Sequence, residues 1–296
     1  MSLQVTFDIF SGRPNPVVAL EGEAAAQVLG QLEPTAKLSG TKALPPFESV
    51  LGYRGLLIEQ TGSAKNSTLP LRFRVVDGKL FAPNTAYTVR DAGVEQFVLA
   101  SVSMKENVQL TPDLIELIAQ QQKLRSIVKP LQTSSASATT PSKCPCAPLY
   151  EPDWWNDAAG GGARQFYNNC YNYACDYRTD TFAQPGRAAG SMYTALTCAA
   201  VQPASVRDAL LAGRASKTIQ CPKEGHLVAL VIWPNSDFHW YRLGRDGLWT
   251  HKPGGTPVTN VDNSGKLITD PRTADRGGYT AFCTFMVVMH GHVKIS

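Results

Sequence analysis

The stretch "QFYNNCYNYACD", residues 165–176, surrounds Cys170 with asparagines and tyrosines and follows the glycine run at residues 160–162. The glycines favour a loop, whereas the residues from Cys170 to about Tyr177 favour a helix. A thiol at the first turn of a helix has a lowered pKa and becomes a nucleophile, whereas a free cysteine elsewhere commonly fills a core. The rest of the sequence has to decide between these two interpretations.

The segments after Cys170 change to the patterns of β-strands. The run "GHLVALVIWP", residues 225–234, is almost continuously apolar, which is typical of a buried strand. Residues 237–255 predict two short aromatic strands around the turn 244–247, and residues 279–288 predict one more. A helix is expected at residues 205–215, with Ser205 as its cap. This half therefore predicts an α+β fold in which the cysteine-bearing helix packs on an antiparallel sheet.

The first half of the chain predicts a small α+β domain over residues 1–131. It contains the proline-bounded turn "SGRPNP", a hairpin turning at Asp77 and Gly78, and a helix that begins with Thr111 and Pro112. Further strands are expected at residues 3–10 and 53–60, and further helices at residues 21–32 and 89–102. No pairing of nucleophile with base and no metal-ligand spacing appears in it. We expect a domain of unknown role whose partner is an unidentified protein.

A serine-, threonine- and alanine-rich segment, residues 132–143, has no periodicity and predicts a linker to a second domain at residues 144–296. The chain has 296 residues, a net charge of +4 and no run of basic and aromatic residues, so nucleic acid is not an expected partner. The first residues lack the features of a secretory signal, and no apolar run reaches membrane-spanning length. The default expectation is a soluble cytoplasmic protein with reduced thiols; signal-independent secretion is the alternative.

Residues 160–290 resemble the NlpC-like branch of the papain-like cysteine peptidases and amidases. The resemblance lies in a helix-borne cysteine, a strand opening "PKEGHLV", the histidine of "DFHWYR" and the histidine of "LWTHKPGG". It implies Cys170 as nucleophile, His239 as base and His251 as the orienting residue. It also implies thiol-dependent cleavage of peptide or peptidoglycan stem-peptide amide bonds, without a cofactor, and a structural role for His226.

This sequence departs from that family around the cysteine, where Asn169 replaces an aspartate and Tyr171-Asn172 replaces Ser-Gly. The position of the oxyanion hole is therefore left open. Candidate donors and walls of the substrate site are the following residues: Gln165, Asn168, Asn169, Trp240 and Trp249. The whole chain also resembles a group of bacterial and fungal proteins with "SGRPNP" near the start and "HKPGGTP" near the end, a resemblance that implies no activity.

The proposed chemistry has its own physical basis. An imidazole within hydrogen-bond reach keeps a thiol deprotonated, and a third polar group fixes the tautomer of that ring. His239 and His251 flank one turn on adjacent strands, and one bulged residue would bring them to the same face. Rival orienting residues in the following loop are these: Asp262, Asn263 and Asp270.

Several alternatives remain open at this stage. The same cysteine and histidine would serve an acyltransferase or a deamidase, and a non-catalytic binding or toxin-delivery module would use the cysteines for packing. Cys175 is expected in the core, because its position rotates it away from the face of Cys170. His290 and His292 share one face if they lie on a strand, but two ligands alone do not predict a metal site, so no metal is expected.

Overall fold

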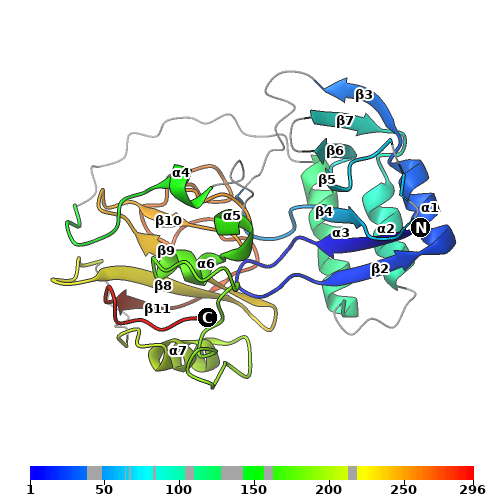
Figure 1. Cartoon of the computed structure of the whole chain (residues 1–296). Coiled ribbons are helices and arrows are strands. Elements are labelled where there is room, and N and C mark those ends of the chain that lie inside the picture. Colours follow the sequence, from blue (N-terminus) through cyan, green and yellow to red (C-terminus); the bar gives the residue numbers. More distant parts are fainter. Residues whose placement is uncertain are drawn as a thin grey trace. The chain divides into compact units, whose positions relative to one another are not determined.

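The computed structural model describes residues 1–38, 49–63, 65–66, 68–82, 85–103, 110–127, 143–156, 163–212 and 219–296. The chain forms two compact units (Figure 1). The first unit comprises Met1–Ile9, Asn15–Glu48 and Tyr53–Pro130, and the second comprises Phe10–Pro14, Ser49–Gly52 and Leu131–Ser296. The glycine run 160–162 and all but the last residue of the expected linker lie outside the described residues, so the linker stays a prediction.

The first unit is built on a seven-stranded antiparallel sheet in the order β2-β1-β4-β5-β6-β7-β3. Its strands are β1 (Ser2–Phe7), β2 (Val17–Glu21), β3 (Pro34–Leu38), β4 (Leu56–Gln60), β5 (Arg72–Val76), β6 (Lys79–Ala82) and β7 (Thr85–Val89). Its helices are α1 (Gly22–Gln31), α2 (Val94–Ser103) and α3 (Pro112–Ile127). The predicted β5–β6 hairpin is confirmed: Asp77 and Gly78 both have positive φ, as its tight turn requires.

The chain that leaves β1 is fixed by a buried ion cluster. Asp8 pairs with Arg54 at 2.6 Å and with Arg74 at 2.8 Å. Burial alone raises the pKa of the Asp8 carboxyl, but the two guanidinium groups outweigh it and hold this pKa below its usual range. These three charged side chains are therefore buried in the first unit and do not lie on a solvated face.

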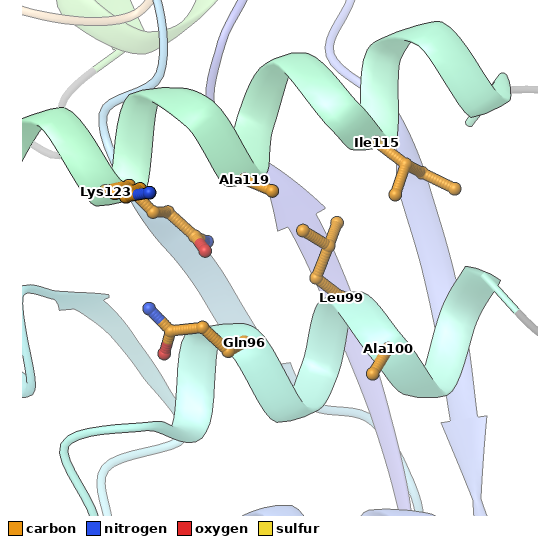
Figure 2. A pocket seen from close by; sticks show the side chains of 7 residues that line it. Gln96, Leu99, Ala100, Ile115, Ala119 and Lys123 are labelled. Atoms are coloured by element: carbon orange, nitrogen blue, oxygen red, sulfur yellow. The ribbon is translucent and has the colours of Figure 1, made fainter.

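Helices α2 and α3 of the first unit border a hollow of about 480 Å³ (Figure 2). The side chains of Leu99 and Ile115 point toward each other across it, and polar side chains gather at the other end. Its lining residues are Gln96, Leu99, Ala100, Ile115, Ala119, Gln122 and Lys123. This lining pairs no nucleophile with a base, so the hollow is not a candidate active site.

The second unit contains a four-stranded antiparallel sheet in the order β10-β9-β8-β11 (Figure 1). The strands are β8 (His226–Trp233), β9 (Asp237–Leu243), β10 (Trp249–His251) and β11 (Ala281–Val288). The helices are α4 (Pro152–Trp155), α5 (Ala163–Tyr167), α6 (Cys170–Ala174) and α7 (Cys198–Arg207). Residues of α6 and α7 join alternate residues of β8, β9 and β11 in one apolar core. The α+β class is confirmed, with α6 packed on the sheet.

The helix expected at residues 205–215 is wrong in position over the described residues 205–212, and residues 213–215 lie outside the described part of the chain. The structure has α7 at Cys198–Arg207, and Ser205 lies in its last turn, where its hydroxyl donates to the carbonyl of Val201. Ala209 has a positive φ that ends the helical path, and Leu211 then bridges Val287 of β11. Tertiary pairing with β11 thus overrides the local helical pattern.

Two disulfides in the second unit overturn the expectation of reduced thiols. Cys144 bonds to Cys221, and Cys198 bonds to Cys283. Partners 77 and 85 residues apart cannot be paired from sequence spacing alone. The three remaining cysteines are free: Cys146 is exposed, whereas Cys170 and Cys175 are buried. No helix in the described part of the chain is long and apolar enough to cross a membrane.

Candidate active site

Helix α6 holds Cys170 at its first position through the asparagines on either side. The side-chain oxygen of Asn169 accepts hydrogen bonds from the backbone N–H groups of Tyr171 and Asn172, at 3.0 and 3.1 Å. The side chain of Asn172 in turn accepts from the backbone N–H of Asn169, which completes a capping box. Cys170 is fully buried, and its sulfur lies 4.0 Å from the carbonyl oxygen of Phe238 on β9.

Strands β9 and β10 bring His239 and His251 together. His251 pairs directly with Tyr241, and Tyr241 and His239 are two residues apart on β9, so all three side chains lie on one face. No bulge is needed between these strands, which corrects the sequence-based expectation. Nε2 of His239 lies 2.9 Å from Nδ1 of His251.

The partners of His251 determine the direction of these hydrogen bonds. Nε2 of His251 lies 3.0 Å from the carbonyl oxygen of Val261, which only accepts, so this nitrogen carries a hydrogen. Burial lowers the pKa of His251 to about 4, so the ring is neutral near neutral pH. Its Nδ1 therefore accepts from the Nε2–H group of His239, and a neutral His239 has an acceptor at Nδ1.

The hydroxyl of Ser11 binds that acceptor nitrogen of His239. Ser11 belongs to the segment Phe10–Pro14 of the second unit. Its Oγ lies 2.5 Å from Nδ1 of His239, and the backbone N–H of Gly254 donates to the same oxygen at 3.3 Å. The Ser11 side chain also lowers the pKa of the Cys170 thiol. The same side chain therefore acts on both the imidazole and the thiol. Sequence analysis missed Ser11; the only signal was that it opens the "SGRPNP" turn.

The carbonyl oxygen of Gly12 lies between two side-chain amides. Nδ2 of Asn169 donates to it at 2.6 Å, and Nε2 of Gln184 donates at 2.8 Å. Nδ2 of Asn169 also donates to the carbonyl of Ala183 at 2.8 Å. Asn169 was an expected donor, whereas Gln184 carried no signal in the sequence. Two N–H donors converging on one carbonyl oxygen form the arrangement that stabilises an oxyanion.

Asp237, at the start of β9, holds the backbone of the same segment. Its carboxylate accepts from the N–H groups of Ser11 at 2.5 Å, Gly12 at 3.1 Å and Arg13 at 3.0 Å. The hydroxyl of Tyr279 donates to it at 2.6 Å. Burial raises the pKa of Asp237, and these donors only partly offset the increase. The three consecutive N–H groups curl the segment around one carboxylate.

The electrostatics around Cys170 favour the neutral thiol in this conformation. Burial raises the pKa of Cys170 strongly, and the carboxylate of Asp237 raises it further. The Ser11 side chain, the backbone of Trp240 and the charge of Lys252 lower this pKa without cancelling the increase. Lys252 is itself buried and donates to the carbonyls of Gln165 and Gly254.

The other expected site residues order a neighbouring loop, bind Lys252 or lie buried in the second unit. The side chain of Asn168 binds Arg164, Thr179 and Asp180 and so orders a neighbouring loop. Gln165 is buried and offers its backbone carbonyl to Lys252. Trp240 lies in the core against Tyr171, and Trp249 packs on Phe285. Both tryptophans are fully buried.

The rival orienting residues hold loops of the second unit. Asp262 accepts from Ser264, Lys266 and Asp275, which closes the turn that contains them. Asn263 exchanges two hydrogen bonds with the backbone of Leu51, and Asp270 pairs with Arg272. Of the four candidates, His251 is the one that the structure shows in contact with His239.

The remaining histidines and cysteines pack in other ways. Nε2 of His226 lies 2.7 Å from the carbonyl of Ala174, and its ring stacks obliquely on that of His290. Cys175 lies in the apolar core of the second unit. Within the described residues, no group of three or more histidine, cysteine or acidic side chains is arranged to hold a metal ion.

Comparison with known proteins gives one relative. The chain is 44% identical over 144 residues to insoluble matrix shell protein 1 of Ruditapes philippinarum, and the match covers 48% of this chain and 91% of that protein. No protein-family model matches the sequence, and no solved structure matches it. At this identity and coverage, the chain belongs to the same protein family as insoluble matrix shell protein 1.

Proposed function

We propose that the second unit is a papain-like, thiol-dependent hydrolase of peptide amide bonds, with Cys170 as nucleophile, His239 as base and His251 as the orienting residue. One observation carries the proposal. His239 binds His251 through Nε2, and its Nδ1 binds the Ser11 hydroxyl, a group that also lowers the pKa of the Cys170 thiol. General-base activation of a nucleophile requires a fixed tautomer with an acceptor nitrogen near the nucleophile, and His239 supplies such a nitrogen once the Ser11 hydroxyl has left it.

The reaction follows from these atoms. The thiol proton of Cys170 passes to Nδ1 of His239, and the thiolate attacks the amide carbon. The amide oxygen becomes an oxyanion that N–H groups of Asn169 and Gln184 stabilise. His239 then gives its proton to the leaving amine, which leaves a thioester on Cys170. Water, deprotonated by His239, hydrolyses the thioester and releases the acid and the free thiol.

This conformation is a closed state of the proposed enzyme. Cys170, His239 and His251 have no solvent exposure, and burial keeps the thiol neutral. A substrate carbonyl reaches the sulfur only after the segment that carries Ser11 has moved. The hydroxyl of Ser11 is then replaced at Nδ1 by the thiol itself.

The nucleophile is tested by measuring the turnover of a fluorogenic peptide amide by Cys170→Ala and by Ser11→Ala. Each variant is made in the wild-type chain and in a Gly12→Ala background, in which the segment that carries Ser11 should be displaced. We expect Cys170→Ala to abolish turnover and Ser11→Ala to retain it, because the serine is not covalently involved. Loss of activity in Ser11→Ala alone would instead identify Ser11 as the nucleophile. Circular dichroism checks that each variant is folded.

A second candidate function is a non-catalytic component of an extracellular matrix. The relative that carries the name of a shell matrix protein favours it, and so does the complete burial of Cys170. In that case His239, Ser11 and Cys170 form a buried polar network that specifies the fold. Absence of turnover in both backgrounds, with the chain folded, would favour this candidate.

We also propose that the protein works in an oxidising compartment. The two disulfides and the shell matrix relative support this localisation. Thiol trapping in denaturant, directly after isolation from the native source, tests it. We expect the three free cysteines to be labelled before reduction and all seven after it. Labelling of all seven before reduction would place the protein in a reducing compartment.

A further inference from the structure

The segment Phe10–Pro14 makes the contacts of a bound peptide within the second unit. It is buried from Phe10 to Gly12, yet it belongs to neither a helix nor a strand. Most of its polar contacts are made by backbone atoms and one hydroxyl: three N–H groups to Asp237, one carbonyl to two amides, and Ser11 to His239. A loop that only connects two strands does not require contacts both with the proposed base and with the proposed oxyanion donors.

From these contacts we propose that the site at Cys170 binds turn-forming peptides that contain glycine, and that Phe10–Pro14 is its resident ligand. The proposal deepens the proposed function, because it names the substrate class of the same site. It rests on that function only in taking Cys170 as the reacting group. The binding itself does not require turnover.

The geometry selects glycine at the central position. A Cβ atom added to Gly12 would lie 2.5 Å from the carbonyl oxygen of Phe238 and equally close to its ring. Phe238 belongs to β9 and to the core, so it cannot move aside without disturbing the sheet. The carbonyl of that glycine is the one held by Asn169 and Gln184, so the peptide bond after glycine is the bond presented to the nucleophile.

The flanking positions are recognised less strictly. Before the glycine, the Ser11 hydroxyl contacts His239, which favours a small polar residue. After it, the guanidinium of Arg13 donates to the carbonyl of Ser236 at 3.1 Å and lies over the ring of Phe10. The Arg13–Ser236 contact lies at the partly exposed end of the segment, so it adds affinity without excluding other side chains.

The test uses the full chain and measures the rate of Cys170 alkylation by iodoacetamide, followed by mass spectrometry of the peptide that contains it. Gly12→Ala should displace the segment and speed alkylation by roughly fivefold to a hundredfold, the range of factors by which overpacking typically shifts an equilibrium. Gly30→Ala is the matched control, because an added Cβ there meets nothing within 4 Å. Arg13→Ala removes contacts that hold the same segment without overpacking, so it should give a smaller increase in the alkylation rate. This variant tests the displacement of the segment if Gly12→Ala does not fold.

Recognition in trans completes the test. The capped pentapeptide Phe-Ser-Gly-Arg-Pro, at about millimolar concentration because the tether is lost, should restore protection of Cys170 in Gly12→Ala. The same peptide with alanine in place of glycine should not protect. The proposal is overturned if folded Gly12→Ala is alkylated as slowly as Gly30→Ala, or if both peptides protect equally. Neither readout depends on amide hydrolysis, so a failure of the proposed enzyme activity would leave these outcomes unchanged.

Discussion

The hydroxyl of Ser11 lies 2.5 Å from Nδ1 of His239, although 228 residues separate the two in sequence. On the other side of the ring, Nε2 lies 2.9 Å from Nδ1 of His251. Hydrogen bonds therefore run in one direction from Ser11 through both histidines to the carbonyl of Val261. This chain of donors and acceptors fixes the tautomer of His239, and each of its members can be tested separately.

The first prediction concerns the acceptor for His239. His251→Asn places an amide oxygen near the position of Nδ1, whereas His251→Leu leaves the Nε2–H group of His239 buried without that acceptor. We expect His251→Leu to lower the free energy of unfolding by about 1–3 kcal/mol more than His251→Asn. Urea denaturation measures the difference, and nitrogen NMR of the His239 ring reports its tautomer. Equal stabilities and an unchanged tautomer would show that His251 does not orient His239.

The second prediction concerns Asn169, which caps α6 with its oxygen and binds Gly12 and Ala183 with its nitrogen. Asn169→Ala loses both roles, whereas Asn169→Asp keeps the cap but directs a carboxylate at two carbonyl oxygens. We expect Asn169→Asp to be the less stable variant at neutral pH, by about 1–3 kcal/mol. The gap should narrow in acid, where the carboxyl is protonated and can donate. Thermal unfolding at two pH values checks the order, which a purely capping role would reverse.

The third prediction concerns pH and His226. Burial lowers its pKa to about 4, below the value of 6.5 for the unfolded chain. The folded state therefore favours the neutral ring, so this contribution is complete above pH 6.5 and is lost as the pH falls toward 4. The loss amounts to about 3 kcal/mol.

The matched variant for that experiment is His226→Gln, which keeps a donor for the carbonyl of Ala174 but does not titrate. The difference in unfolding free energy between wild type and variant should decline as the pH falls through this window. Carboxyl groups with raised pKa values, such as Asp237, act in the opposite direction, but they are common to both proteins and cancel. A difference that does not change with pH would show that His226 titrates in the folded state as it does in the unfolded chain.

The fourth prediction concerns the disulfides. Each closes a long loop, with partners 77 and 85 residues apart, so each should stabilise the second unit by about 2–5 kcal/mol. We expect the double variant Cys198→Ala, Cys283→Ala to unfold at a lower denaturant concentration. Cys146→Ala is the control, because Cys146 is exposed and free, and it should match wild type. Similar midpoints for the double variant and the control would contradict the assignment.

Local sequence patterns determined much of the second unit's sheet. The apolar run of β8 and the short turn between β9 and β10 are encoded by neighbouring residues, and side chains alternate along a strand. Because His239 and His251 lie on either side of that turn, their proximity followed from the sequence. The capping asparagine likewise marks the start of α6 directly before Cys170.

Only the tertiary structure decided which groups join that pair of histidines. Ser11, Gly12 and Gln184 reach the site from loops, where no periodicity predicts a direction, and the cysteine partners are 77 and 85 residues apart. The position of α7 also depended on tertiary contacts, because Leu211 pairs with Val287 of β11 and does not continue the helix. Contacts between distant segments depend on how the whole core packs, and local propensity carries no information about that packing.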